Sequence, residues 1–227
     1  VDILVTPLVT IFAGVGLSML IAAPIGAAAS QVGTLIMWAT EQAPLVMGIL
    51  VSVIVGVALT LPISSAAICA ALGLTGLAGG AAVAGCCAQM VGFAVMSYRE
   101  NGVGGLVSQG LGTSMLQMGN IIKNPRIWIA PTLASAITGP LATCLFHFEM
   151  NGAAVSSGMG TCGLVGQIGV YTGWVSDIAA GTKAAITPMD WAAMVLLCFV
   201  LPAVLSVVFC EVERKLGWIK EGDLKLN

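Results

Sequence analysis

The chain has 227 residues, of which 58% are hydrophobic and 8% charged, and its mean hydropathy is +1.03. This composition excludes a water-soluble globular domain and predicts a protein that lives in the lipid bilayer. The net charge of −2 belongs to a few loops and therefore predicts neither a nucleic-acid partner nor an acidic one.

The cysteines predict neither a disulfide framework nor a metal site, and we expect no cofactor. They form no CxxC pair and fall almost entirely in apolar runs, where cysteine behaves as a small hydrophobe. The seven positions are Cys69, Cys86, Cys87, Cys144, Cys162, Cys198 and Cys210. Since the chain begins at Val1, without a methionine or a basic-then-apolar leader, we expect a piece of a longer polypeptide that lacks an N-terminal part.

The apolar runs near the N-terminus are long enough to cross a bilayer, which takes about 20 residues as a helix. Residues 3–29 form the first run, and Pro24 is expected to kink it. Residues 30–43 carry Trp38 and several polar side chains, which is typical of an interfacial segment. Residues 44–61 then cross again.

The chain is interrupted after this crossing. Pro62 and Ser64 break the apolar run, and residues 66–72 are too short to span, so we expect a half-helix or re-entrant piece whose backbone is covered by protein. Residues 73–97 form a third span, whose small residues include a GxxxG pair suited to close helix packing. Residues 98–101 are the first polar loop.

The run from residue 106 to residue 122 predicts an amphipathic helix with an uncharged polar face. Apolar side chains recur there at helical spacing, and amide and hydroxyl side chains recur on another face. The polar face consists of Gln109, Thr113, Gln117 and Asn120. Two placements remain open: the helix lies flat at the membrane interface, or it stands inside the bundle with its amides facing a wet cavity.

The second half of the chain contains two further spans. Residues 127–146 form one and residues 191–210 the other, and a charged tail follows at 211–227. Asp177 and Lys183 mark a loop between the two spans.

Lysine and arginine gather in three short segments. Seven of the eight cations lie at residues 98–104, 123–126 and 211–227. Short loops rich in these residues stay on the cytoplasmic side, so we expect all three segments, including the C-terminus, on the cytoplasmic face. This arrangement requires that the amphipathic segment does not cross the membrane completely.

The stretch FHFEMNGAAVSSGMGTCGLVGQIG at residues 146–169 is the candidate site. A carboxylate at membrane depth costs about 2.5 kcal/mol or more, so Glu149 is expected to face a cavity, a partner or a substrate. The glycines at every third position from 160 to 169 drift by about 60° per step around a helix, so they cannot form one straight stripe. Irregular or closely packed backbone is the better account, and beside a carboxylate its amides and carbonyls suit a polar, uncharged ligand such as a sugar.

A simpler interpretation is equally open. Residues 147–151 would then form an ordinary polar turn at the outer interface, and residues 156–169 a tightly packed helix. A single histidine between two phenylalanines is more often an interfacial residue than part of a site. On the sugar-site interpretation, the substrate-binding residues are Glu149, Asn151, His147, Gln167, Gly163, Asn120 and Gln117, and no catalytic residue is assigned.

Four segments resemble one known family, the phosphotransferase-system EIIC-like family that includes proteins of the perfringolysin-regulator type. They are LTLPISSAAICAALGLTGLA at 59–78, AVMSYRENGVGGL at 94–106, GNIIKNPRIWIAPTLASAITGPLAT at 119–143 and GMGTCGLVGQIG at 158–169. The resemblance covers residues 1–174. It implies a relative of the glucose-superfamily EIIC sugar permeases, with re-entrant hairpins around a midplane site and a homodimeric assembly.

The resemblance also implies a ligand and a partner. Sugar permeases of the wider superfamily use a glutamate in a short proline-containing motif, and FEMNG at 148–152 supplies that glutamate as Glu149, without the proline. The implied ligand is a sugar or polyol. Because this chain has no soluble domain to carry a phosphoryl group, the implied donor is a separate EIIB-type protein.

We therefore expect an all-α, polytopic transmembrane helical bundle with re-entrant hairpins and a cytoplasmic amphipathic helix. A membrane domain at 1–210 would precede a charged cytoplasmic tail at 211–227, in the bacterial cytoplasmic membrane. Three functions remain open: an EIIC-type component of a sugar phosphotransferase system, a membrane sensor on the same fold that binds without transport, and a transporter without phosphotransfer.

Overall fold

The computed structural model describes residues 2–226, without the side chains of residues 2–8, 13 and 17–25 in the first helix. The chain is 80% helical, with ten α-helices and no β-strand among the residues described. Short 3-10 and π turns join or extend several of the helices. The predicted all-α class is confirmed.

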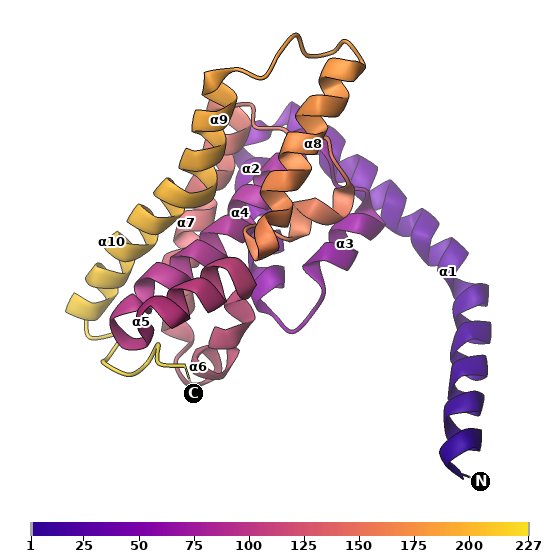
Figure 1. The fold of residues 1–227 in the computed structure, drawn as a ribbon, viewed down its shortest axis with the longest axis horizontal. Helices are drawn as coiled ribbons and strands as arrows, with labels where there is room; N and C mark the ends of the chain where they lie inside the picture. Colours follow the sequence, from indigo (N-terminus) through magenta and orange to yellow (C-terminus); the bar gives the residue numbers. More distant parts are fainter. Residues whose placement is uncertain (1, 227) are drawn as a thin grey trace.

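The N-terminal helix α1 (Asp2–Gln42) is a single helix of 41 residues whose first part reaches away from the rest of the chain (Figure 1). The division expected here, a span at 3–29 and a separate interfacial segment at 30–43, is wrong. The polar side chains of the second part are compatible with a helix: the Thr34 hydroxyl, for example, donates to a carbonyl one turn earlier at 3.0 Å. The kink expected at Pro24 concerns a residue outside the described side chains.

Three helices pack against one another at the centre of the bundle: α2 (Pro44–Thr60), α4 (Gly76–Met96) and α7 (Ile129–Pro140). Turns at Pro125–Trp128 and Leu141–Leu145 extend α7 at both ends, so that it belongs to one apolar helix of 21 residues. Of the apolar window of α4, 89% is buried inside the protein. This helix is therefore the axis around which the other elements pack.

A further long helix lies along one side of this centre. α9 (Pro188–Val195), a π turn at Leu196–Val200 and α10 (Leu201–Lys215) run on as one apolar helix of 28 residues. Among the described residues, three helices are long and apolar enough to cross a membrane, and α2 is a shorter apolar helix. Four of the five spans expected from the sequence, all except the one at 3–29, coincide with these helices to within about five residues.

The contacts between the central helices fix their relative directions. The Ser52 hydroxyl of α2 donates to the carbonyl of Ser135 in α7 at 2.8 Å, and the Ser135 hydroxyl lies 3.3 Å from the carbonyl of Gly85 in α4. Eight residues further along α2, the Thr60 hydroxyl donates to Gln89 of α4 at 3.3 Å. Hence α2 and α4 run in the same direction, and the chain must return between them through α3 (Ser65–Leu72).

Gln89 is the centre of a buried polar network without charges. Its side-chain oxygen accepts from the indole N–H of Trp128 at 2.9 Å, and its nitrogen donates to the Thr132 hydroxyl at 3.3 Å. The Thr60 hydroxyl shares the oxygen and lies 2.9 Å from the hydroxyl of Ser114. The network pairs polar groups from four segments, of which Thr60, Gln89 and Ser114 are fully buried and Trp128 and Thr132 half-buried.

Residues 98–123 form a helical hairpin, which we call hairpin A. Its arms are α5 (Tyr98–Val107) and α6 (Met118–Lys123), and short π and 3-10 turns lie between them. The chain reverses at Thr113, whose backbone is extended (φ −160°, ψ 139°).

Two expectations for this region are wrong. The polar loop at 98–101 is helical, and the amphipathic helix at 106–122 is broken in the middle. The break brings two members of its polar face together: Gln117 donates to Gln109 across the hairpin at 2.8 Å. The polar face is thus satisfied within the protein rather than by lipid headgroups.

Residues 146–179 form hairpin B, which comes from the opposite end of the bundle (Figure 1). Its first arm is irregular and contains the 3-10 turns Ala154–Gly158 and Cys162–Leu164, and its second arm is α8 (Val165–Ala179). The prediction of irregular or closely packed backbone is confirmed: the first arm is irregular, and Gly166 and Gly169 in the regular helix α8 are closely packed. Positive φ angles occur in the first arm at Gly160 (52°), Gly163 (53°) and Leu164 (58°).

The tips of the two hairpins meet inside the bundle. The Thr161 hydroxyl of hairpin B donates to the carbonyl of Gly110 in hairpin A. Beside them, the Ser65 hydroxyl at the start of α3 donates to the carbonyl of Gly158 at 2.7 Å. The tip of hairpin A, the tip of hairpin B and the start of α3 therefore lie close together beside α4.

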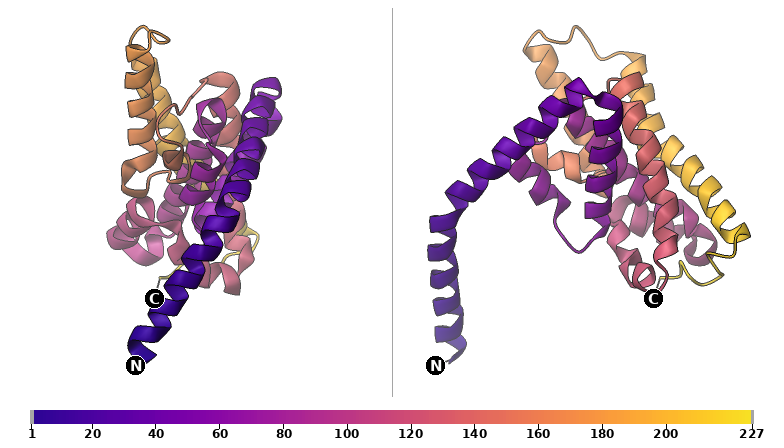
Figure 2. Two further views of the ribbon diagram at one scale, coloured as in Figure 1. Left: turned by 90° about the vertical axis from the view of Figure 1, so that its right-hand side faces the viewer. Right: turned by 180° about the vertical axis from the view of Figure 1, so that it is seen from behind.

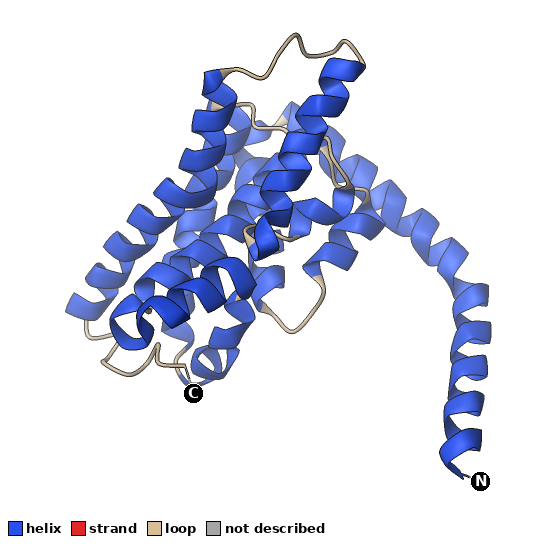
Figure 3. Cartoon of the chain, in the orientation of Figure 1, coloured by secondary structure: helices blue, strands red, loops and turns tan. Residues whose placement is uncertain are grey.

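The three cationic segments lie together at one end of the molecule, as expected. The side chain of Asn101 donates to the carbonyl of Leu224 at 2.8 Å, and that of Asn124 donates to the carbonyl of Trp218 at 2.9 Å. Figure 2 shows the C-terminus at this end and the connection between α8 and α9, which is a loop (Figure 3), at the other.

Candidate functional site

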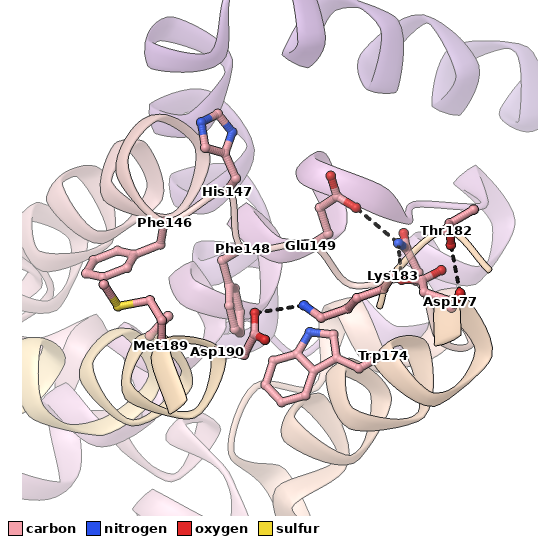
Figure 4. Close-up of a pocket in the computed structure, with 12 residues that line it drawn as sticks. Phe146, His147, Phe148, Glu149, Trp174, Asp177, Thr182, Lys183, Met189 and Asp190 are labelled. Atoms are coloured by element: carbon pink, nitrogen blue, oxygen red, sulfur yellow. Dashed lines mark hydrogen bonds and ion pairs between the residues drawn. The ribbon is translucent and has the colours of Figure 1, made fainter. Parts of the chain in front are cut away.

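A cavity of about 480 Å³ lies between the two arms of hairpin B and the start of α9. Its walls come from three stretches: the residues that follow α7, the last turns of α8, and the connection that leads into α9 (Figure 4). It lies toward the end of these helices rather than half-way along them. The lining residues are Phe146, His147, Phe148, Glu149, Asn151, Trp174, Asp177, Thr182, Lys183, Met189, Asp190 and Ala193.

The segment that carries Glu149 is extended and is held at both ends. Met150 and Gly76 exchange backbone hydrogen bonds of 2.9 and 3.0 Å, and the N–H of Phe148 donates to the carbonyl of Ala142 at 2.8 Å. These bonds use the backbone groups that an extended segment would otherwise leave unpaired. The side chain of Glu149 is thereby left free to face the cavity.

Glycines on both sides let this segment lie between two helices. A Cβ on Gly80 of α4 would collide with the carbonyl of Phe148, and a Cβ on Gly173 of α8 would lie 2.8 Å from the backbone nitrogens of Asn151 and Gly152. Only glycine permits so close an approach of backbone to helix. The glycines in α4 and α8 thus allow the segment that forms the wall of the cavity to pack directly against both helices.

Asn151 joins two carboxylates at the wall of the cavity. Its side-chain nitrogen donates to Glu149 at 3.1 Å and to Asp177 at 2.8 Å. Neither carboxylate forms an ion pair in the described chain, whose salt bridges all involve other acids. Both oxygens of each group can accept several hydrogen bonds, so most of their acceptor capacity faces the cavity.

The connection between α8 and α9 closes another side of the cavity. Lys183 lies 2.8 Å from Asp190 and places its ammonium 5.4 Å from the centre of the Trp174 ring. Asp190 also accepts from the N–H and hydroxyl of Thr187, whose hydroxyl caps the start of α9 in return. This reciprocal capping fixes the beginning of α9 and, through the ion pair, the position of Lys183.

The structure brings three of the seven residues expected to bind substrate to this cavity. His147, Glu149 and Asn151 all line it, and His147 does so with a positive φ of 43°. This backbone conformation is uncommon outside glycine and turns the chain sharply after α7. These three residues therefore share one concave surface.

The other four expected residues lie elsewhere. Gln167 is buried and donates to the sulfur of Cys87 at 3.2 Å, and Gly163 is exposed in the turn before α8. Gln117 and Asn120 bind the C-terminal tail at the opposite end of the bundle, through the carbonyls of Leu224 and Lys225.

The glycines that follow Glu149 also have another role than the one expected. Gly166 packs against the carbonyl of Gly160, and Gly169 packs against the side chain of Ser156. They expose backbone to protein rather than to the cavity. What they achieve is the close packing of the two arms of hairpin B.

The sequence-based interpretation did not assign the tryptophan and three of the charged residues of the cavity to the site; these are Trp174, Asp177, Lys183 and Asp190. Their signal was present, because these three charges and two nearby tryptophans stand between apolar runs. The interpretation treated the first two charges as loop markers only. The arrangement offers carboxylate acceptors, one ammonium and an aromatic ring to a polar ligand, and no cluster suited to a metal ion occurs among the described residues.

Comparison with known proteins gives one finding. The family model described as "Phosphotransferase system, EIIC" matches residues 1–226 of this chain. The comparisons with curated proteins and with solved structures found no match.

Proposed function

This chain belongs to the phosphotransferase system EIIC family, the membrane components of sugar phosphotransferase systems, and on that premise we propose that it binds a sugar or polyol and carries it across the membrane for phosphorylation by a separate protein. We further propose that residues 1–210 are the transport domain and that residues 211–227 are a cytoplasmic tail. The phosphoryl donor would be an EIIB-type protein that approaches from the cationic end of the bundle.

The observation that carries the proposal is the pair of carboxylates in the cavity. Glu149 and Asp177 both accept from one nitrogen of Asn151, so their nearest oxygens lie within a few ångströms of each other. Adjacent hydroxyl groups of a sugar or polyol are donors at a similar spacing, and a carboxylate accepts such donors well. These hydrogen bonds would satisfy both carboxylates without a cation to pair with them.

The two hairpins support transport rather than binding alone. They come from opposite ends, and their tips meet beside α4 through the hydrogen bond between Thr161 and Gly110. Irregular backbone inside a membrane bundle is typical of transporters in which one part moves against another around a ligand. We propose that hairpin A and hairpin B are the re-entrant hairpins of this domain.

We also propose a homodimer. In the first part of α1, the described side chains of Val9 and Phe12 are 60% and 71% exposed, and this part of the helix reaches away from the bundle (Figure 1). An apolar helix with this much exposed surface is suited to contact a second copy within the membrane.

The test is ligand binding by the full chain in lipid nanodiscs, measured by calorimetry against a panel of hexoses and hexitols. Glu149→Gln keeps the shape of the side chain and removes its charge. Hydrogen bonds to a charged group are worth about 1.5–3 kcal/mol, and since Glu149 is exposed we take the lower end, which is about a tenfold loss of affinity. Glu221→Gln, an exposed carboxylate of the tail, is the matched control and should leave affinity unchanged.

Uptake by proteoliposomes distinguishes the three functions. Binding with uptake that depends on an added phosphoryl donor supports the proposal. Binding without uptake would indicate a sensor, and uptake without any donor would indicate a transporter that does not use phosphotransfer. If no hexose or hexitol binds, or if Glu149→Gln binds as the parent does, the cavity is not a sugar site.

A further inference from the structure

The C-terminal tail is folded into the bundle rather than free in solution. Ile219 and Leu224 are 3% and 0% exposed, and they belong to one apolar cluster with Phe93 and Met96 of α4 and with Ile121 of hairpin A. A segment with two fully buried anchors is an integral part of the packing at this end.

Hairpin A recognises the backbone of this tail. The carbonyl of Leu224 accepts from Asn101 at 2.8 Å and from Gln117 at 3.0 Å, and its N–H donates to Glu100 at 2.9 Å. Asn101 also accepts from the N–H of Leu226 at 2.8 Å, so its amide pairs with the tail as a neighbouring strand would.

A continuous chain of contacts leads from the tail to the tip of hairpin A. The same nitrogen of Gln117 that donates to Leu224 also donates to the oxygen of Gln109 at 2.8 Å. Gln109 is fully buried, and its own nitrogen donates to the Ser97 hydroxyl at 2.7 Å. The next residue, Gly110, receives the hydrogen bond from Thr161 that joins the two hairpins.

We propose that residues 216–226 form a strap that holds hairpin A in place. Through Gln117 and Gln109, the bound strap also stabilises the contact between the tips of the two hairpins. In the strapped state, Leu224 is seated and the tip at Gly110 is held against Thr161. When the strap leaves, Gln117 and Asn101 lose their hydrogen bonds to the tail, and hairpin A is free to separate from hairpin B. The amides that the sequence suggested for substrate thus act as receptors for the chain's own tail. This inference does not depend on the identity of the ligand.

The strap is closed by an ionic anchor. Glu100 of hairpin A accepts from Arg214 of α10 at 3.1 Å with one oxygen and from the N–H of Leu224 with the other. Both charged side chains are largely buried, with exposed fractions of 15% and 9%. The end of α10, the tail and hairpin A therefore share a single carboxylate, which makes their arrangement mutually dependent.

The experiment is amide hydrogen exchange of the full chain in nanodiscs. Leu224→Ser removes the apolar anchor, and we expect exchange to accelerate by about tenfold or more in the tail, in residues 104–117 and in residues 158–164, with residues 44–60 unchanged. Leu197→Ala is the matched control: it truncates a leucine that is equally buried but lies in the cluster around α9. It should leave the hairpin tips protected.

A second variant distinguishes the binding of the tail from the link between Gln117 and Gln109. Gln117→Leu cuts the link to Gln109 and removes one of the two hydrogen bonds to the Leu224 carbonyl. The hydrogen bond from Asn101 and the apolar cluster around Leu224 remain, so the tip should open while Ile219 and Leu224 remain protected. A synthetic peptide of residues 216–226, added to the Leu224→Ser protein, should restore protection at the tips, whereas a scrambled peptide should not. Acceleration confined to the tail, uniform acceleration along the chain, or a tip that stays protected in Gln117→Leu would each overturn the inference.

Discussion

A single methyl group on Gly80 should disrupt the wall of the cavity. Gly80 lies inside α4, and a Cβ there would collide with the carbonyl of Phe148, the residue before Glu149. The obstacle is backbone, which cannot turn aside as a flexible side chain can. Gly80→Ala must therefore displace the extended segment, and the Glu149 carboxylate would move with it.

The size of the effect follows from two opposing terms. Alanine in place of glycine within a helix stabilises by about 1 kcal/mol, whereas forcing an extra methyl group into a packed site costs about 1–3 kcal/mol. Because the collision is with backbone, we take the upper end of the second term. The net loss is then about 2 kcal/mol, which is roughly a thirtyfold fall in the ratio of folded to unfolded protein.

The assay compares Gly80→Ala with Gly104→Ala in detergent solution, by chemical unfolding and by ligand affinity. Gly104 lies in α5 with no atom within 4 Å of an added Cβ, so its alanine variant should be as stable as the parent or slightly more so. If Gly80→Ala is as stable as Gly104→Ala and binds ligand equally well, the segment is not held in the way described.

Three further predictions concern other parts of the molecule. Asp190→Asn should cost about 1 kcal/mol through the weakened helix cap and the lost ion pair with Lys183, and limited trypsin digestion should cut faster after Lys183. Single cysteines introduced at Lys123 and Thr182 should be labelled from opposite sides of sealed vesicles, and labelling from one side would refute the topology. Gln89→Leu should cost about 2–3 kcal/mol, because it removes the acceptor shared by the half-buried indole N–H of Trp128 and the buried hydroxyl of Thr60, and unfolding in detergent measures this loss.

The membrane helices were predictable because length and apolarity determine them. α2, α4 and α7 were all expected at nearly their observed positions, since an uninterrupted apolar run of this length has few alternatives to a helix in a bilayer. The same reasoning misjudged the end of α1, where polar residues suggested a boundary. Polar side chains do not end a helix unless they offer the backbone a better partner.

Hairpin A shows where reasoning from periodicity stops. The polar face of residues 106–122 was recognised, but its partners were not, because Gln117 binds Leu224, which is 107 residues away along the chain. A periodic pattern states only that a face needs polar contacts. Whether water, lipid or a distant segment supplies them depends on tertiary packing.

The cavity was half predictable for a similar reason. His147, Glu149 and Asn151 are neighbours in sequence and could be recognised together, whereas Asp177 and Asp190 come from two different helices. These two carboxylates come near each other because the connection after α8 places the start of α9 beside the end of α8. No local pattern encodes that placement.

The enclosure of α4 has a consequence for how the protein is made. Gln89 finds its hydrogen-bond partner Thr132 only 43 residues later, and α10, which also packs on α4, is synthesised later still. At about 5–20 residues per second, the ribosome delivers that partner only after several seconds. During this interval α4 must remain at the translocon or face lipid with the side-chain nitrogen of Gln89 unpaired, since Thr60, already synthesised, pairs only with the oxygen. Assembly of this protein therefore depends on delaying the release of its central helix until the helices that enclose it have been synthesised.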